Sequence, residues 1–182
     1  MLTTAALTAV AVVAGLLRRG SIERLASTRF KFLWLLWLGF GIQIGAQIWS
    51  PTWLTDGWEL TVLLVSNGLV AAFLVTNFRL PGVALAGTGL VLNVLVIGLN
   101  GAMPVDEDAS RSAGIGRSLE QAGLKHERLD SDTVLPWLGD VLPIAVLREV
   151  LSVGDILLAS GIAYLVYARM TQRRGRHSVV TE

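Results

Sequence analysis

Cysteine is absent from the 182-residue sequence, histidine occurs twice, and only 16% of the residues are charged. Without cysteine, the chain has no disulfides, no thiolate metal ligands, no cysteine nucleophile and no lipid-modified cysteine anchor. The two histidines, His126 and His177, are too few for the usual zinc sites, so we expect no metal and no cofactor. The net charge of +1 leaves no broad basic surface, and nucleic acid is therefore not expected as a partner.

Apolar residues dominate what is present. They make up 53% of the chain, which is typical of an integral membrane protein and not of a soluble domain. Because one helical crossing takes about 20 residues, the length suffices for one bundle, and we expect a single transmembrane domain over 1–182. The predicted fold class is all-α, a polytopic membrane helix bundle of about five transmembrane helices. The helices are expected at roughly 1–17, 32–49, 60–76, 83–99 and 153–168.

Charges that flank the apolar segments predict their orientation. The loop 50–59 contains Asp56 and Glu59 but no basic residue, and Trp49, Trp53 and Trp58 lie in it or at its start, which favours the extracytoplasmic side. The other short loops and the tail 169–182 are basic, which favours the cytoplasmic side. Their ten basic residues are Arg18, Arg19, Arg24, Arg29, Lys31, Arg79, Arg169, Arg173, Arg174 and Arg176. We therefore predict a multi-pass protein with its N-terminus out, its C-terminus in and a first helix that is retained.

Residues 100–152, which we call the long connection, are then expected to be extracytoplasmic. Ser118 and Gln121 fit a capping box, which predicts a short helix within 118–129, and the rest is expected to be irregular. The stretch TVLPWLGDVLPIAVL (133–147) is apolar, but Pro136, Gly139 and Pro143 interrupt it, so it is too short to span. We expect it to pack over the outer ends of the helices as a lid, because lipid cannot satisfy irregular backbone.

Polar side chains inside the apolar segments predict a pocket beneath this lid. Most of them lie toward the outer ends of their helices, and acids follow at the lid and at the start of the last helix. Buried polar groups in lipid surroundings are candidates for function. The predicted ligand-binding residues are Gln47, Asn93, Asn100 and His126, and the two acids are Asp140 and Asp155.

Each of these residues also has a purely structural interpretation. In Ser152-Val-Gly-Asp155 the serine and the acid match a capping box, which would account for Asp155 without chemistry. Asn100-Gly101 is an ordinary helix-terminating pair, and Asp140 fits a turn. The amides of Gln43, Gln47 and Asn67 are candidate hydrogen-bond partners between helices. Lys125 and His126 form a pair that is typical of a solvated surface. Gly41 and Gly45 form a G-x-x-x-G motif, which indicates close helix packing.

Four strings of the sequence occur in the same order in an uncharacterised bacterial family. They are NGAMPV (100–105), KH (125–126), TVLPWLGDVLP (133–143) and SVGDILLASG (152–161). Together they resemble the domain of unknown function numbered 5317. The resemblance implies a small integral protein of the bacterial cytoplasmic (inner) membrane and implies no particular activity.

Two functions remain open. The first is a non-enzymatic binding or accessory subunit whose pocket holds a membrane lipid, a small polar ligand or a partner membrane protein, with the oligomeric state undecided. The alternative is a membrane-embedded aspartic hydrolase that acts on a lipid or lipopeptide through Asp140 and Asp155. Two close carboxylates can share a proton, one then acting as general base for water and the other as general acid. This alternative rests on a looser likeness to signal peptidase II, whose Gly-Asn and Asp-Arg elements are missing here.

Overall fold

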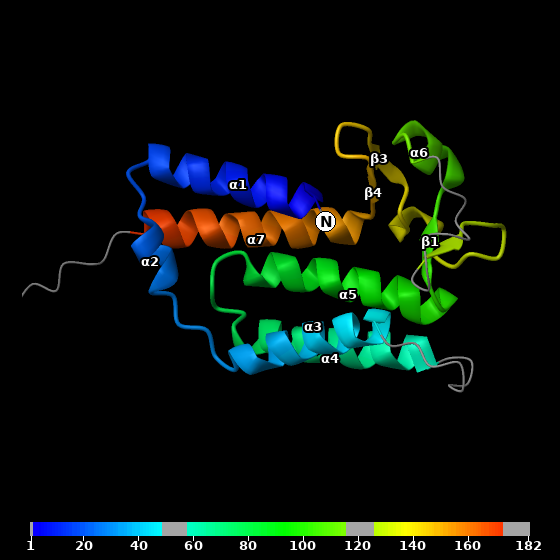
Figure 1. Ribbon diagram of the computed structural model, residues 1–182, viewed down its shortest axis with the longest axis horizontal. Coiled ribbons are helices and arrows are strands. Elements are labelled where there is room, and N and C mark those ends of the chain that lie inside the picture. The colour runs from blue at the N-terminus through cyan, green and yellow to red at the C-terminus, as the bar shows by residue number, and fades with distance from the viewer. Residues whose placement is uncertain (1, 49–57, 116–125, 173–182) are drawn as a thin grey trace, which may run out of the picture.

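The computed structural model describes residues 2–48, 58–115 and 126–172 (Figure 1). Each of the five apolar segments forms a helix, and the predicted helical character of the chain is confirmed. These helices are α1 (Leu2–Leu17), α3 (Leu33–Ile48), α4 (Trp58–Thr76), α5 (Val83–Asn100) and α7 (Val153–Thr171). A short helix, α2 (Ile22–Ala26), lies between α1 and α3. By length and composition, α5 and α7 can cross a membrane, whereas the described apolar parts of the other three helices are shorter.

The five apolar helices form a row. α1 packs on α7, α7 on α5, α5 on α4, and α4 on α3, so α7 contacts two helices that are distant from it in the sequence (Figure 1). The last helix therefore lies between the first and the fourth apolar helices. One end of the row carries α2 and the connection between α4 and α5, and we call it the basic end. The long connection covers the opposite end, which we call the capped end.

Glycines bring α5 and α7 into backbone contact. A Cβ atom added to Gly89 would lie 2.3 Å from the carbonyl oxygen of Gly154, and one added to Gly161 would lie 2.4 Å from the amide nitrogen of Ala86. Gly82 faces Gly161 in the same way. Because the glycines on each helix are seven residues apart, they occupy one face of it. We call this contact the glycine seam.

The G-x-x-x-G motif of α3 does not act as predicted. Atoms added at Gly41 or Gly45 would meet nothing within 4 Å, so neither glycine mediates close packing in the part of the chain that the structure describes. The α3–α4 contact is closest at Gly39, where an added Cβ would lie 2.9 Å from the Ser66 carbonyl oxygen. The motif was misleading because spacing alone does not say which face of a helix meets its neighbour.

The chain is mostly helical, as predicted, but the described part of the long connection adds four short strands where irregular structure was expected. β1 (Met103–Val105) pairs in parallel with β2 (His126–Arg128), and β3 (Leu142–Ile144) pairs antiparallel with β4 (Glu149–Leu151). Its described residues also form a short helix, α6 (Glu107–Ser112), and a 3-10 turn, η2 (Pro136–Leu138). The described parts of the connection, 100–115 and 126–152, are therefore folded, not irregular. The connection contacts α5 through β1 and η2 and contacts α7 through β4.

The helix predicted within 118–129 is also corrected. Its proposed cap, Ser118 and Gln121, lies outside the described residues, but His126–Arg128 is a strand. Strand pairing with β1 determines the conformation here, and local capping signals do not contain that information. The helix that does form, α6, begins after Asp106, whose side chain accepts a hydrogen bond of 2.8 Å from the Asp108 amide. This is the usual arrangement of an N-cap aspartate.

A carboxylate of the long connection also caps the first helix. Glu149 in β4 accepts hydrogen bonds from the Leu2 amide at 2.5 Å and from the Thr3 amide and hydroxyl at 2.8 Å. Amides at a helix N-terminus have no partner within the helix, and a carboxylate is favoured beside them. Burial opposes ionisation of Glu149, but the hydrogen bonds that it accepts, these among them, together outweigh burial and lower its pKa. The cap fastens α1 to the capped end.

Candidate functional site

A polar network joins α5 to the start of α7 at the capped end. The Asn93 side-chain amide donates a hydrogen bond of 2.7 Å to Oδ1 of Asp155. The Ser152 hydroxyl donates to the carbonyl oxygen of the Asn93 side chain at 2.9 Å. Ser152 is fully buried and the other two side chains are half-buried. Three polar side chains from two helices therefore satisfy one another.

The same residues form the predicted capping box. The Asp155 amide donates to the Ser152 hydroxyl oxygen at 2.9 Å, and the Ser152 amide donates to Oδ2 of Asp155 at 3.3 Å. The structural interpretation of Ser152 and Asp155 is thus confirmed. Both carboxylate oxygens of Asp155 accept hydrogen bonds, one from its own helix start and one from α5.

The glycine seam positions this network. Gly154 lies between the two network residues of α7, and a Cβ atom added to it would lie 1.9 Å from Oδ1 of Asn93 and 2.7 Å from the Gly89 carbonyl oxygen. A larger residue at 154 would therefore displace Asn93 or separate the helices. The absence of a side chain at this position is what allows Asn93 to reach Ser152 and Asp155.

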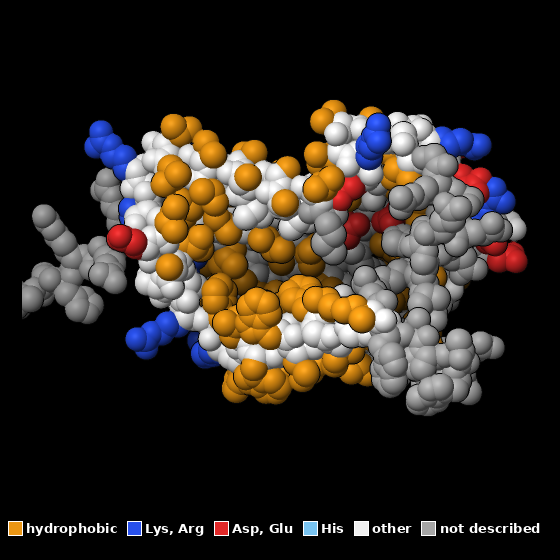
Figure 2. Space-filling model, in the orientation of Figure 1, with side chains coloured by type: hydrophobic (Ala, Val, Ile, Leu, Met, Phe, Trp, Pro, Cys, Tyr) orange, Lys and Arg blue, Asp and Glu red, His pale blue; other side chains and the backbone are white. Residues whose placement is uncertain are grey.

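Asp140 lies next to this network in the long connection. Its side chain is buried, and its backbone is held against β1 by a bond from its amide to the Pro104 carbonyl at 2.8 Å and by a bond from the Asp106 amide at 3.0 Å. Burial raises the pKa of Asp140 to about 7, and the charge of Asp155 adds to the increase. The two predicted acids thus interact electrostatically. Figure 2 shows acidic side chains grouped where the capped end meets α7.

Asn100, another predicted ligand residue, does not join this group. The Asn100 side chain exchanges two hydrogen bonds with the backbone of Val134, at 2.8 and 3.0 Å, and fastens the long connection to the end of α5. Gly101 follows it with a φ of +86°, so the prediction of a helix-terminating pair is confirmed. The backbone of His126 lies in β2, opposite Met103. The side chains of His126 and Gln47, and all of Lys125, lie outside what the structure describes.

Two amides predicted to link helices behave differently. Gln43 on α3 donates a hydrogen bond of 3.0 Å to the Ser66 hydroxyl on α4, as the interhelical interpretation predicts. Asn67 donates to the Leu63 carbonyl of its own helix at 2.8 Å. Gln43 therefore links helices, whereas the bond of Asn67 is local.

The sequence did not identify Ser152 as a partner of Asn93. Its only signal was the matching spacing of glycines in two helices, Gly82 and Gly89 in one and Gly154 and Gly161 in the other. Residues next to opposed glycines come within hydrogen-bonding distance because the helix axes are close. Among the described residues, no group of three or more histidine, aspartate or glutamate side chains is placed to hold a metal ion.

Comparisons with known proteins give one match. The model of a family of unknown function, DUF5317, matches residues 27–167. No curated protein and no solved structure matches the chain. The matched range includes α3, α4, α5, the long connection and most of α7, and so it contains the whole polar network. The chain belongs to the DUF5317 family of unknown function.

Proposed function

We propose that this chain is an integral membrane protein whose helix row lies in the bilayer. The observation that carries the proposal is the exposure of large apolar side chains on all five apolar helices. Such broad apolar surfaces are rare on water-soluble proteins and are normal where lipid is the solvent. The exposed residues include Val10 and Val13 on α1, Trp34, Trp37 and Ile44 on α3, Val65 and Val75 on α4, Val91, Leu95 and Leu99 on α5, and Ile156 and Tyr164 on α7.

The two longest apolar helices support the same proposal. The core helix of a soluble protein is mostly buried, but only 28% of the apolar window of α5 and of α7 is buried. At 18 and 19 residues, each helix is about 27 to 29 Å long, close to the thickness of the hydrocarbon core. The shorter helices, α1 and α3, would then cross a locally thinned region or sit with their flanking residues at the interface.

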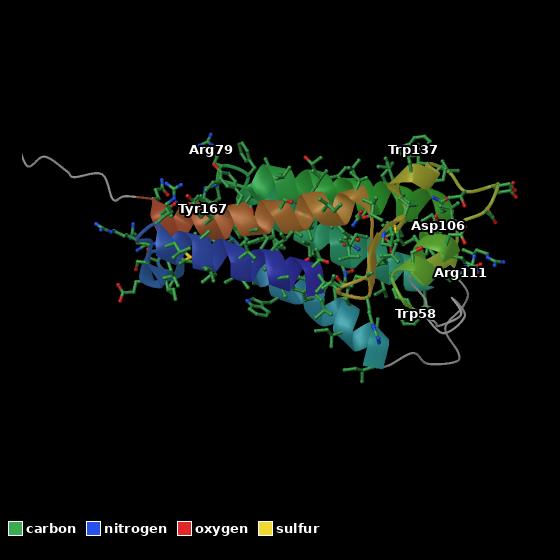
Figure 3. All side chains as sticks on the ribbon, turned by 90° about the horizontal axis from the view of Figure 1, so that it is seen from above. Trp58, Arg79, Asp106, Arg111, Trp137 and Tyr167 are labelled. Atoms are coloured by element: carbon green, nitrogen blue, oxygen red, sulfur yellow. The ribbon has the colours of Figure 1, made fainter. Side chains whose placement is uncertain are left out.

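The distribution of charge supports the orientation that we propose, with the basic end in the cytoplasm. The described cations of the cytoplasmic loops gather at that end, and Arg79 and Tyr167 lie far from Trp58, Asp106 and Trp137 at the capped end (Figure 3). Positively charged loops favour the cytoplasmic side. The long connection would then be extracytoplasmic, with the exposed Trp137 at the membrane surface.

Within the membrane we propose a non-enzymatic binding or accessory subunit. Asp155 supports this role, because both of its oxygens are engaged in joining α5 to α7. An acid used in this way holds the helices and the long connection in place. Membrane lipid and a partner membrane protein are the binding partners that fit such a subunit.

One observation favours a membrane-embedded hydrolase as the second candidate. The raised pKa of Asp140 and the charge of Asp155 beside it fit a pair of acids in which one is protonated and the other ionised. In that reaction Asp155 would be the base for water and Asp140 the acid that protonates the leaving group, with Asn93 orienting the substrate.

Two experiments test these proposals. After introduction of single cysteines into the cysteine-free chain, at Arg79 and at Asp132, labelling of intact cells with a membrane-impermeant maleimide should modify position 132 only. Labelling of both positions, or release of the chain from membranes by alkaline carbonate, would contradict the membrane proposal.

The second experiment separates the subunit from the hydrolase. Native mass spectrometry from nanodiscs would compare wild type with Asp140→Asn and Asp155→Asn. A second polypeptide that is lost from the variants supports the subunit. A lipid or lipopeptide that accumulates on both folded variants, but not on wild type, supports the hydrolase.

A further inference from the structure

The cations of the basic end differ from those of the capped end in their partners. At the capped end, Arg111 pairs with Asp108 and Arg128 pairs with Glu107, whereas Arg148 forms no ion pair within the described residues. At the basic end, the connections and helix ends carry seven described arginine and lysine residues but a single acid, Glu23. None of the seven forms an ion pair within the described residues. Figure 2 shows blue side chains at both ends of the molecule, whereas most red side chains lie at the capped end.

Two arginines of the basic end converge on the last turn of α7. Arg24 of α2 donates to the Gln172 backbone carbonyl at 3.4 Å and to the Arg19 carbonyl at 2.8 Å. Arg169 of α7 donates to the Gln172 side-chain oxygen at 2.7 Å. Both side chains are half-buried. Two positive charges from different helices are thus held near one residue by neutral acceptors.

Neutral acceptors do not neutralise these two charges. The carbonyl groups at a helix C-terminus carry only a partial negative charge, equivalent to about half an electron for the whole helix end. The Nε atom of Arg169 is buried and has no hydrogen-bond partner within the described residues. Buried guanidinium donors are normally satisfied, and a planar guanidinium matches the oxygens of a phosphate group. An anion with several oxygens therefore fits the guanidinium groups of Arg24 and Arg169.

We infer that Arg24 and Arg169 form a binding site for the phosphate of an anionic phospholipid headgroup. The inference rests on the proposed membrane function, because the basic end must lie at a bilayer surface to meet headgroups. The source of the phosphate is then the membrane itself. Anionic lipids attract arginine and lysine beside a membrane segment, and here the two guanidinium groups add directional hydrogen bonds. The cytoplasmic leaflet would thus bind the helix row at the junction of α2 and α7.

Native mass spectrometry from nanodiscs with equal amounts of phosphatidylglycerol and phosphatidylcholine tests the site. Wild type should retain phosphatidylglycerol in preference. Arg24→Gln and Arg169→Gln should each weaken this retention about fivefold, and the double variant should retain both lipids equally. The matched control, Arg111→Gln with Arg148→Gln at the capped end, should behave like wild type. Arg24→Lys with Arg169→Lys should retain a part of the preference, because charge remains while the planar donors are lost.

The contrary outcomes are distinct. Equal retention of the two lipids by wild type, or undiminished preference in a folded double glutamine variant, would overturn the headgroup site and leave the proposed function intact. Displacement of the lipid by inorganic phosphate alone would also overturn it, because the site would then take a soluble anion. Failure of the wild-type chain to enter nanodiscs would overturn both the site and the proposed function. Circular dichroism of each variant identifies those that do not fold.

Discussion

The α5–α7 contact and the α3–α4 contact are both made by apolar helices that contain glycine and polar residues, yet they are built differently. Between α5 and α7, four glycines let the backbones touch, and the seam ends in a closed network of three polar side chains. Between α3 and α4, one glycine is in close contact, and a single hydrogen bond links Gln43 to Ser66. Glycine content alone is therefore a poor guide to helix contact, whereas glycines at matched spacing in two helices are informative.

The largest expected effect comes from adding a side chain to the seam. Gly154→Val would place atoms against Asn93 and the Gly89 carbonyl, so we expect a loss of more than about 3 kcal/mol of stability in detergent, or failure to fold. Gly41→Val on α3 is the matched control, since nothing lies within 4 Å, and its effect should stay within about 1 kcal/mol. Equilibrium unfolding monitored by circular dichroism measures both variants. Equal losses would mean that the two contacts do not differ as described.

The second effect is a dependence on pH at the capped end of the seam. The pKa of Asp140 is raised from 3.8 to about 7, so between these values the folded state binds a proton that the unfolded state has released. The contribution of Asp140 to stability should therefore be largest below about pH 4, fall as the pH rises from 4 to 7 and stay low above 7, with an amplitude on the order of 4 kcal/mol.

Asp140→Asn tests whether this carboxyl is responsible for the pH dependence. The variant should lose most of the change in unfolding free energy between pH 4 and pH 8 and be more stable than wild type at the higher pH. Asp132→Asn, an exposed acid of the same connection, is the control and should keep the wild-type profile. An unaltered profile for Asp140→Asn would assign the pH dependence to other groups.

The third effect concerns the polar network itself. Asn93→Leu removes the partner of Asp155 and Ser152, and the cost should be about 1 to 3 kcal/mol, because buried polar groups are left unsatisfied. Ser152→Ala should cost about as much, and the double variant less than the sum of the two. A double-mutant cycle in unfolding measurements gives the coupling energy. Additive losses would show that Asn93 and Ser152 act independently.

The smallest effect is expected in the α3–α4 contact. Gln43→Leu removes one half-buried hydrogen bond, and the Ser66 hydroxyl keeps its bond to the Leu63 carbonyl, so the cost should be about 0.6 kcal/mol or less. Asn67→Leu should be similarly mild, because the Asn67 side chain bonds to the Leu63 carbonyl of its own helix. A loss above about 2 kcal/mol for Gln43→Leu would remove the contrast between the two contacts.

The sequence predicted the parts of the fold that depend on local patterns. Long apolar runs identified the five helices, and Ser152 and Asp155 were correctly placed in a capping box, because a helix start is determined by neighbouring residues. The sequence also predicted a polar group at the capped end, since Asn93, Asp140 and Asp155 are polar residues within apolar runs. Which residues belong to this group, however, depends on which helices are neighbours.

Features that depend on distant pairing were missed. β1 and β2 are three residues each, which is too short for an alternating pattern to mark them, and β1 pairs with β2 and, at Val105, with Asp140. Asn100 was predicted to line the pocket, but its side chain bonds to the backbone of Val134 in the long connection, 34 residues away. The row order α1, α7, α5, α4, α3 could not be derived from apolar runs, and that order is what brings Asn93 to Asp155.

The position of α1 has a consequence for biosynthesis. Its first amides are capped by Glu149, and at its other end the Ser21 amide bonds to the Met170 carbonyl at 3.0 Å. A ribosome makes α1 before these partners, so the helix remains incompletely capped and without its packing surface until α7 has been synthesised. Assembly of the row is therefore expected to finish with the docking of α1, after α5 and α7 have met.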